Sequence, residues 1–400
     1  MRLLVVAMSN SVHTARWLSQ VADQGWDIHL FPSIDEWIDV HPDFRNLTLY
    51  HSGCRPVGPN ASGVRFRGVS VFRRAAEVYR RRVSRSDVPG YRARQLARVI
   101  DRIRPDVVHS LEIQHAGYLT LEAKRLCRKP FPPWIATNWG SDIYLFGRLD
   151  AHEPLIRGVL AECGYYSCEC RRDVCLARAF GFQGTVLPVC PNSGGFDLDL
   201  AARLVRPGPV SARRLVMLKG YQSFAGRALV GIRALERCAD LLKSAGYEVA
   251  VYSAAPEVAI AAELFSKSTG VPVRIVPKET PHAEILALHG QARASLGLSI
   301  SDAISTSLLE ALVMGSFPVQ SFTACADEWI EDGVTGLLVP PDDPDVVEAA
   351  LRRALTDDGL VDGAAVKNGL LAAERLDRRL LKPMAVGIYR TVAQEAGGRT

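Results

Sequence analysis

The chain has 400 residues, of which 48% are hydrophobic and 23% charged, and its formal net charge is +5. This composition is typical of a globular protein, and the length predicts two domains rather than one core. No run approaches the roughly 18 apolar residues of a membrane-spanning helix, which excludes an evident transmembrane segment.

Short β-branched runs alternate with helical patterns through the first half of the chain. The apolar run at 2–8 is predicted as a strand and not as a signal peptide, because polar residues follow it without a small-residue cleavage pattern. We therefore expect a cytoplasmic protein. A helix is expected after this run, ending near Gly25. Further strands are predicted at 27–33, 106–112, 134–140 and 184–189.

The cysteines of this half bear on whether the chain binds a metal. Four of the nine cysteines cluster without the paired C-x2-4-C spacing of zinc sites, so free thiols are favoured over a metal site. They are Cys163, Cys168, Cys170 and Cys175.

The segment 65–104 is strongly basic, with thirteen arginines against three acids, a net +10 that leaves about −5 for the rest of the chain. Such a segment suits nucleic acid, anionic lipid or phosphorylated substrates. No nucleic-acid motif with interleaved aromatic residues accompanies it, so nucleic acid is not an expected partner. One interpretation is that 65–104 makes a peripheral contact with the inner face of an anionic membrane. The alternative is compositional bias, because arginine outnumbers lysine along the whole chain.

The second half repeats the alternation of strands and helices. A helix is predicted at 226–246, and strands are predicted at 214–218, 247–253, 273–277, 294–300, 317–321 and 336–340. Such alternation predicts parallel sheets with right-handed crossovers, and hence an α/β protein with two doubly wound, Rossmann-like domains. Pro207-Gly208-Pro209 interrupts the pattern. We expect domains at 1–205 and 210–375, followed at 376–400 by helices broken around Pro383.

The stretch SDAISTSLLEALVMGSFPV (301–319) places two acids, Asp302 and Glu310, where a strand is expected to turn into a helix. In an open parallel sheet, ligands gather at the carboxyl ends of the strands, and phosphates bind helix amino termini. Ser305 is a natural N-cap, and the amides of Thr306 and Ser307 face out of the helix start.

A nucleotide-sugar suits this layout. The helix amides would hold a diphosphate, and Asp302 would hold a sugar hydroxyl. Glu310 would hold a ribose, because its side chain leans toward the helix start. The alternative is that Asp302 only favours the helix start electrostatically and Glu310 is an ordinary solvated residue.

The chain resembles the retaining, nucleotide-sugar-dependent glycosyltransferases of GT-B fold, especially glycosyltransferase family 4. That family's signature is an acid, seven residues and a glutamate, then a Gly-x-Pro strand and an E-I-V-x-D-G-x-x-G-L-L-V-x-P run. The matching residues here are Asp302-x7-Glu310, GSFPVQS (315–321) and DEWIEDGVTGLLVPPDDP (327–344). The first half matches at RPDVVHS (104–110) and at TNWGSDIY (137–144), in place of a T-x-H-G-S-D-like element.

The resemblance implies an acceptor-binding first domain and a donor-binding second domain that face a cleft, with the last helices crossing back to the first domain. It implies transfer of a sugar, with retention, from a nucleotide-diphosphate sugar to a hydroxyl acceptor in polysaccharide, glycolipid or glycosylated-metabolite assembly. No cofactor is expected besides this co-substrate. No metal is expected either, because Asp343 as N-cap with Pro344 behind it accounts for the acidic run 340–345.

Several candidate residues follow from the resemblance. Lys219 and Arg227 match a phosphate-holding basic pair in reversed order, and Pro277 belongs to a loop expected to meet the base. The acceptor side offers candidates after the predicted strands of the first domain, namely His13, Arg16, His115, Trp139 and Asp142. An ordinary packed histidine remains the alternative for His115, and a turn cap the alternative for Asp142.

Three positions depart from the family pattern. The first acid is Asp302 instead of glutamate, Ala303-Ile304-Ser305 replaces Gly-x-Gly, and Trp139 replaces a histidine whose catalytic contact is therefore not carried over. These departures keep two other hypotheses open. One is a degenerate, non-catalytic nucleotide-sugar-binding subunit, and the other is a sugar-nucleotide epimerase or hydrolase of the same fold.

Overall fold

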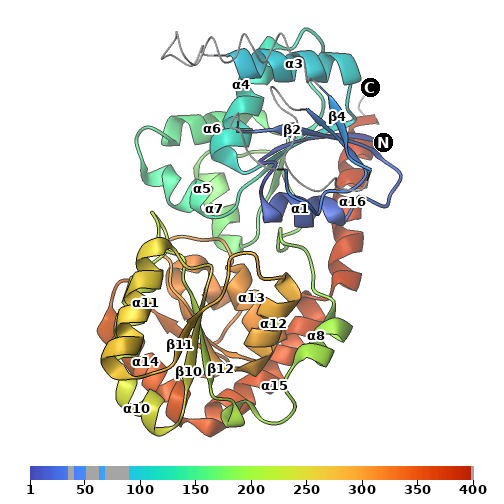
Figure 1. The fold of residues 1–400 in the computed structure, drawn as a ribbon. Coiled ribbons are helices and arrows are strands. Elements are labelled where there is room, and N and C mark those ends of the chain that lie inside the picture. The colour runs from blue at the N-terminus through green and yellow to red at the C-terminus, as the bar shows by residue number, and fades with distance from the viewer. Residues whose placement is uncertain (35–39, 51–62, 68–89, 398–400) are drawn as a thin grey trace. The chain divides into compact units, whose positions relative to one another are not determined.

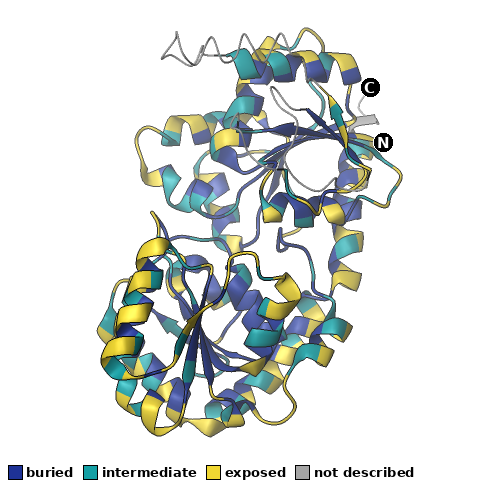
Figure 2. Cartoon of the chain, viewed as in Figure 1, coloured by how far each residue is buried: buried dark blue, intermediate teal, exposed yellow. Residues whose placement is uncertain are grey.

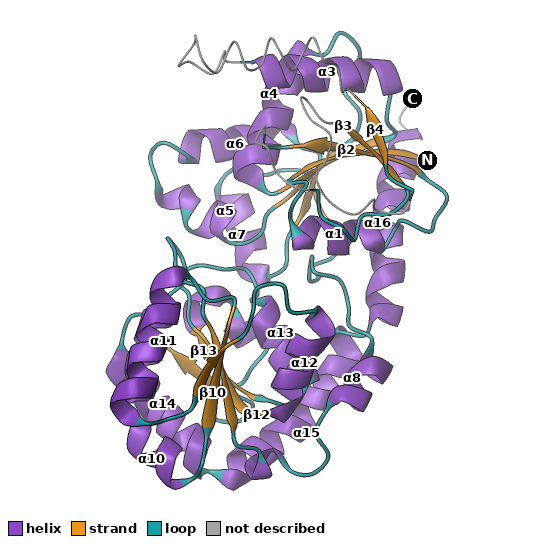
Figure 3. Ribbon diagram, viewed as in Figure 1, coloured by secondary structure: helices purple, strands orange, loops and turns teal. Residues whose placement is uncertain are grey.

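Strands and helices alternate along the chain and form two separate parallel sheets in the computed structural model (Figures 1 and 3). The structure describes residues 1–34, 40–50, 63–67 and 90–397. One unit consists of Met1–Gly194 with Lys382–Thr400, and the other of Gly195–Leu381. The predicted α/β class with two doubly wound sheets is confirmed.

The sheet of the first unit has its described strands in the order β4-β3-β2-β1-β5-β6-β7-β8. The chain enters at β1, moves outward to one edge, and returns beside β1 with β5, which is the doubly wound pattern. The strands are β1 (Arg2–Ala7), β2 (Asp27–Pro32), β3 (Leu47–Tyr50), β4 (Arg65–Arg67), β5 (Val107–Leu111), β6 (Trp134–Thr137), β7 (Tyr165–Ser167) and β8 (Thr185–Val186). The sequence did not predict β3, β4 and β7, because runs this short show no readable alternation.

Helices cover both faces of this sheet, whose strands are largely buried (Figure 2). α3 (Tyr91–Ile103), α4 (Tyr118–Leu126) and α6 (Glu153–Glu162) pack their apolar residues on one face. α1 (Val12–Ser19) and the C-terminal α16 (Arg378–Gly397) contribute to the other face. The shorter α5 (Ser141–Tyr144) and α7 (Arg171–Ala179) follow β6 and β7.

Helix α16 is tied to the first unit by a buried polar cluster. The hydroxyl of Tyr389 accepts a hydrogen bond from Trp17 Nε1 at 2.7 Å and lies 2.7 Å from His109 Nδ1. His109 Nε2 is 2.6 Å from Thr137 Oγ1, so both ring nitrogens are paired. Burial lowers the pKa of His109 to about 3, which keeps the ring neutral.

The second sheet has its strands in the order β11-β10-β9-β12-β13-β14. They are β9 (Leu215–Lys219), β10 (Glu248–Tyr252), β11 (Val273–Ile275), β12 (Ala292–Gly297), β13 (Phe317–Ser321) and β14 (Leu337–Val339). The chain builds one half outward from β9 and the other half outward from β12. The strand order therefore reverses between these two neighbours, and open α/β sheets bind ligands at the carboxyl end of such a switch point.

The helices of the second unit lie on both sides of this sheet (Figure 1). α9 (Ala228–Arg237), α11 (Pro256–Thr269) and α14 (Pro344–Thr356) pack on one face, and α12 (His282–Gln291) and α13 (Thr306–Val313) pack on the other. α8 (Leu198–Leu204), α10 (Ala239–Ser244) and α15 (Asp358–Arg375) complete the unit. The helix predicted at 226–246 is divided at Cys238 into α9 and α10.

The division into units differs from the boundaries expected at 205/210 and 375/376. Phe196 and Ala201 lie in an apolar cluster with residues of α12 and α13, so the chain joins the second unit before α8. Helix α16 also continues through Pro383, where the sequence suggested a break. Asp377 starts this helix by accepting from the Arg379 amide at 2.8 Å, and Pro383 lies inside the helix beyond its first turn, where it removes one hydrogen bond of the ladder without ending the helix.

The cysteines, the basic segment and the helix lengths bear on the remaining expectations. None of the described cysteines forms a disulfide, and Cys163, Cys168 and Cys170 are buried while Cys175 is exposed. Most of the basic segment 65–104, namely 68–89, lies outside the described residues. In the part of the chain that is described, no helix has the length and hydropathy to cross a bilayer.

Candidate functional site

The start of α13 lies at the carboxyl edge of the second sheet, after β12. The turn between them is fixed by Ser299, whose amide donates to Ser321 Oγ at 3.0 Å and whose carbonyl accepts from that hydroxyl at 2.8 Å. Ala303 and Ile304 are 0% and 4% exposed, and Ile304 belongs to an apolar core cluster. The residues that replace Gly-x-Gly are thus packed inward beneath the helix start.

A chain of hydrogen bonds joins the end of β9 to the first turn of α13. Lys219 Nζ donates to Ser305 Oγ at 3.0 Å, and the hydroxyls of Ser305 and Ser307 are 2.7 Å apart. The Ser307 hydroxyl also pairs with the buried Tyr252, whose pKa is raised by burial and by the nearby Glu310 carboxylate. Ser305 occupies the predicted N-cap position, but its side chain accepts no bond from the helix amides because Lys219 and Ser307 engage it instead.

Glu310 is buried, and its carboxylate faces helix α12. One oxygen, Oε1, lies 2.8 Å from His282 Nε2, and the other, Oε2, lies 3.6 Å from His289 Nε2. The alternative that Glu310 is an ordinary solvated residue is therefore wrong, since it is 5% exposed. The histidines were missed in the sequence, although their spacing of one heptad in HAEILALH puts them on one helix face.

His289 is the buried neighbour of Glu310 on α12. It is fully buried, and burial lowers its pKa to about 4 against the opposing effect of the Glu310 carboxylate, so its ring is neutral. Its Nδ1 is 2.8 Å from Ser295 Oγ, and its ring meets Tyr252 edge-on at a centroid distance of 5.4 Å. Lys219, the two serines, Tyr252, His289 and Glu310 thus form one contiguous polar group inside the second unit.

The other candidates of this unit lie around that group. Asp302 is half-buried, and its Oδ1 accepts from the Ala303 amide at 2.9 Å, so it helps to shape the turn. Pro277 is exposed after β11, and its carbonyl accepts from the Thr280 amide in a tight turn.

Arg227 is already engaged by neighbouring groups. Its Nε donates to Asp342 Oδ1 at 2.7 Å, and its Nη1 donates to the carbonyls of Ser223, Phe224 and Gly226. The loop after β9 is therefore wrapped around this guanidinium. Asp343, which follows Asp342 in the sequence, accepts from the amides of the first turn of α14, and this confirms the predicted N-cap.

In the first unit, His13 and Trp139 are neighbours. Ser11 caps α1 by accepting from the His13 amide at 3.2 Å, and the His13 ring lies 5.5 Å from that of Trp139 at an angle of 54°. The residue that replaces the family histidine therefore stands against another histidine. Arg16 is half-buried on the same helix, and together with burial its charge lowers the pKa of His41.

His115 and Asp142 meet around a third residue, Glu112, which the sequence did not single out. Glu112 has φ of 77°, and its carboxylate accepts from the amides of His115 and Ala116 at the start of a π-helical turn. Its Oε2 is 3.3 Å from His115 Nδ1. Asp142 accepts from the Ile113 amide at 2.8 Å, and burial together with the Glu112 charge raises its pKa to about 7.

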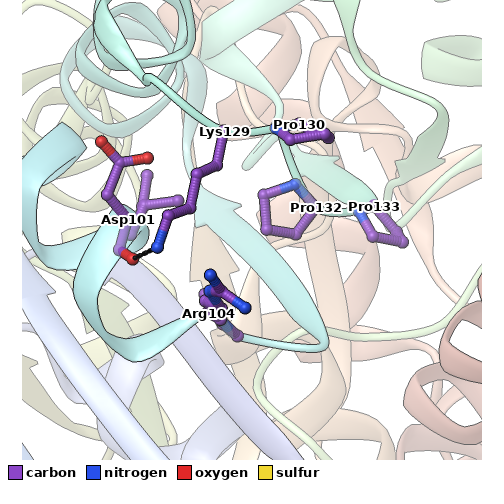
Figure 4. A pocket seen from close by; sticks show the side chains of 8 residues that line it. Asp101, Arg104, Lys129, Pro130, Pro132 and Pro133 are labelled. Carbon is purple, nitrogen blue, oxygen red and sulfur yellow. Dashed lines mark hydrogen bonds between the residues drawn. The ribbon is translucent and has the colours of Figure 1, made fainter.

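A pocket of about 370 Å³ in the first unit is a separate feature (Figure 4). Its cationic side is Lys129, whose Nζ donates to the Asp101 carbonyl at 3.1 Å, with Arg104 close by. It is lined by Ile100, Asp101, Arg104, Pro105, Lys129, Pro130, Pro132 and Pro133. These residues precede β5 and β6, so the pocket lies at the amino ends of the strands, opposite the edge where such sheets bind ligands.

Comparison with known proteins assigns a class to this arrangement. A family model described as glycosyl transferase 4-like matches residues 72–164, and one described as glycosyl transferases group 1 matches residues 267–368. The second match includes Glu310 and the whole of α12 and α13. No curated protein sequence matches the chain significantly.

Solved structures share the fold over nearly the full chain at low sequence identity. Sucrose-phosphate synthase from Thermosynechococcus elongatus superposes with a TM-score of 0.69 at 14% identity, covering 98% of this chain and 99% of that one. The UDP-forming α,α-trehalose-phosphate synthase from Burkholderia xenovorans gives 0.67 at 14% identity, with coverages of 98% and 99%. Anabaena HepE in complex with UDP-glucose gives 0.64 at 12% identity and covers 100% of both chains.

The fold is therefore GT-B, and the chain is a glycosyltransferase of the family-4-like type.

Proposed function

We propose that this glycosyltransferase transfers a sugar, with retention of anomeric configuration, from a nucleotide-diphosphate sugar to a hydroxyl acceptor. One observation carries the proposal. A cation, two hydroxyls and a buried carboxylate are gathered at the start of α13, beside the switch point of the second sheet. The UDP-glucose held by the HepE structure supports a donor of this class.

Lys219 and the start of α13 would bind the diphosphate. The ammonium group is held against the helix start by Ser305, and a helix amino terminus favours phosphate through its amides and its dipole. In retaining transfer, the bond from the anomeric carbon to the diphosphate breaks while the acceptor oxygen bonds on the same face. Negative charge accumulates on the leaving phosphate, so a fixed cation stabilises the transition state more than the ground state.

Glu310 would bind the ribose, and Asp302 would bind a hydroxyl of the transferred sugar. Both hold fixed positions, Glu310 against His282 and Asp302 in the turn before α13. Arg227 would assist at the phosphates, and Pro277 would border the base. This scheme uses no metal ion, because Lys219 and the helix amides supply the positive field.

On the acceptor side, the His13–Trp139 pair and the Glu112–His115–Asp142 cluster, together with Arg16, are the proposed contacts. The acceptor would be a glycan, a lipid-linked sugar or a small metabolite. We further propose a cytoplasmic protein that touches an anionic membrane through 65–104.

The test is a donor screen followed by a turnover assay. UDP-, GDP-, ADP- and dTDP-sugars are added to the protein, and a ligand of the native state raises its melting temperature. We expect stabilisation by one nucleotide class, and release of nucleoside diphosphate only when a hydroxyl acceptor is also present, unchanged by a chelator. No stabilisation by any nucleotide-sugar would overturn the proposal.

A second candidate function is a nucleotide-sugar-binding subunit without transfer. It is favoured by the ion pair of Arg227 with Asp342, because this carboxylate competes with a phosphate for the guanidinium. Donor binding without turnover on an acceptor panel would select this candidate. Donor consumption without acceptor would instead select an epimerase or hydrolase.

A further inference from the structure

The two histidines that face Glu310 make contacts of different kinds. His289 Nε2 is 3.6 Å from Oε2, too long for a hydrogen bond, and the neutral ring is anchored to Ser295 at its other nitrogen. His282 Nε2 is 2.8 Å from Oε1, within hydrogen-bond distance. A carboxylate oxygen only accepts, so His282 Nε2 is the donor and fixes the direction of one carboxylate oxygen.

The ring of His282 is itself held in place. It is the first residue of α12, and the amides of Glu284 and Ile285 bond back to the Pro281 carbonyl. The ring lies 6.4 Å from that of Phe196 at an angle of 36°, and Phe196 is buried in the apolar cluster below α8 and α13. A donor fixed in this way removes rotational freedom from the Glu310 side chain.

His282 also differs from His289 in accessibility. Its side chain is 40% exposed, whereas that of His289 is 0% exposed. It starts α12, which follows the loop after β11 that we assign to the base. Removal of the His282 ring therefore alters the rim of the candidate site without opening the core.

We propose that His282 is a positioning residue that orients Glu310 toward the ribose and thereby sets a preference for ribonucleotide over 2′-deoxyribonucleotide donors. The inference rests on the proposed function, in which Glu310 accepts from the ribose hydroxyls. A buried carboxylate with one oxygen fixed by a donor presents its remaining lone pairs in one direction. A ligand that lacks a hydroxyl there loses its hydrogen bond to this carboxylate, and a site built to bond a hydroxyl rejects such an analogue strongly.

The experiment measures calorimetric binding of UDP, GDP and ADP and of their 2′-deoxy counterparts to four forms of the protein. These are the wild type, His282→Ala, His282→Gln and the control Glu284→Ala, which removes an exposed charge from the same helix turn. For the wild type we expect one ribonucleotide to bind at least about ten-fold more tightly than its deoxy form.

His282→Ala should weaken the ribonucleotide by about ten-fold while the deoxy form binds as before, so that the preference disappears. His282→Gln should retain much of the preference for the ribonucleotide, because the glutamine amide can donate to Glu310 Oε1 in place of the His282 Nε2. Glu284→Ala should behave as the wild type. Melting temperatures of the variants report whether the fold is intact.

The outcomes separate this inference from the proposed function. If the wild type binds no nucleotide, both are overturned. If it binds nucleotides and His282→Ala keeps the ribose preference, the role of His282 is overturned while donor binding stands. A wild type that binds both forms equally overturns the ribose role of Glu310 and the inference with it.

Discussion

Lys219 Nζ donates a hydrogen bond to Ser305 Oγ across 3.0 Å, and this bond links residues that are 86 positions apart. They meet because β9 and β12 are neighbours at the switch point of the second sheet. The cation thus reaches the start of α13 through the sheet topology and not through any local sequence feature. The same contact explains why Ser305 does not cap its own helix.

Substitution of Lys219 by alanine should abolish most of the transfer activity. We expect kcat/KM to fall by about 10²- to 10³-fold, as for loss of one preorganised group that stabilises a developing charge. The melting temperature should hardly change, because Lys219 contributes one hydrogen bond at the end of a strand. Lys267→Ala, which removes an exposed lysine of α11, is the matched control, and full activity of Lys219→Ala would end this assignment.

Ser305→Ala should affect donor binding more than helix stability. The hydroxyl holds Lys219 and Ser307 and makes no capping bond, so the usual loss of about 1 kcal/mol for a removed cap is not expected. We expect the donor KM to rise about five-fold, the effect of one lost hydrogen bond. A lowered melting temperature with unchanged donor KM would show instead that Ser305 serves only the helix.

Arg227→Ala should lower stability and donor affinity together. The guanidinium holds three carbonyls of the loop after β9, and hydrogen bonds of a charged group contribute about 1.5–3 kcal/mol. Asp342→Ala should have a smaller effect on thermal unfolding, at most about 1 kcal/mol, because Asp342 is 63% exposed. Reduced donor affinity of Arg227→Ala at an unchanged melting temperature would contradict the structural part of this role and leave the phosphate contact alone.

The buried Asp142 should make the first unit less stable as the pH rises. Burial and the Glu112 charge raise its pKa to about 7, whereas an unfolded aspartate titrates near 4. Between these values the folded state holds a proton that the unfolded state has released, so stability falls with rising pH, by at most roughly 4 kcal/mol.

Asp142→Asn removes this titration and can still accept from the Ile113 amide. The melting temperature should therefore fall from about pH 5 to about pH 7.5, and this fall should be larger for the wild type than for Asp142→Asn. Asp150→Asn, at an exposed position, should follow the wild type. Equal pH dependence in all three proteins would refute a raised pKa for Asp142.

Tyr389→Phe should destabilise the first unit by about 2–3 kcal/mol, because it leaves two buried groups, Trp17 Nε1 and His109 Nδ1, without their shared partner. Tyr165→Phe is the comparison, since its hydroxyl donates to Glu395 of the same helix in a less buried setting. Thermal unfolding should show a clearly smaller loss for Tyr165→Phe. Equal losses would mean that burial of the Tyr389 cluster adds nothing to the stability of the first unit.

The sequence predicted features that depend on local pattern. The strand, turn and helix around 292–313 follow from an apolar run, a polar turn and helical spacing, and the cap Asp343 follows from the Asp-Pro-Asp order. The short strands β3 and β7 lacked enough residues to show alternation.

Side-chain partners across the fold could not be predicted in this way. Glu310 was recognised as a candidate, but its partner His282 lies 28 residues earlier on another helix. The pairing of Arg227 with Asp342 spans 115 residues. Periodicity determines which face of an element is buried, whereas the neighbour that meets a polar group depends on how the helices pack.

Helix α16 determines the order in which the two units can be completed during translation. Residues 195–381, which form the second unit, leave the ribosome as one uninterrupted stretch. The residues before them emerge first, yet Trp17 and His109 receive the hydroxyl of Tyr389 only when synthesis is almost over. The earliest part of the nascent polypeptide is thus completed last, and any premature stop codon after residue 194 and before Tyr389 would leave it unfinished.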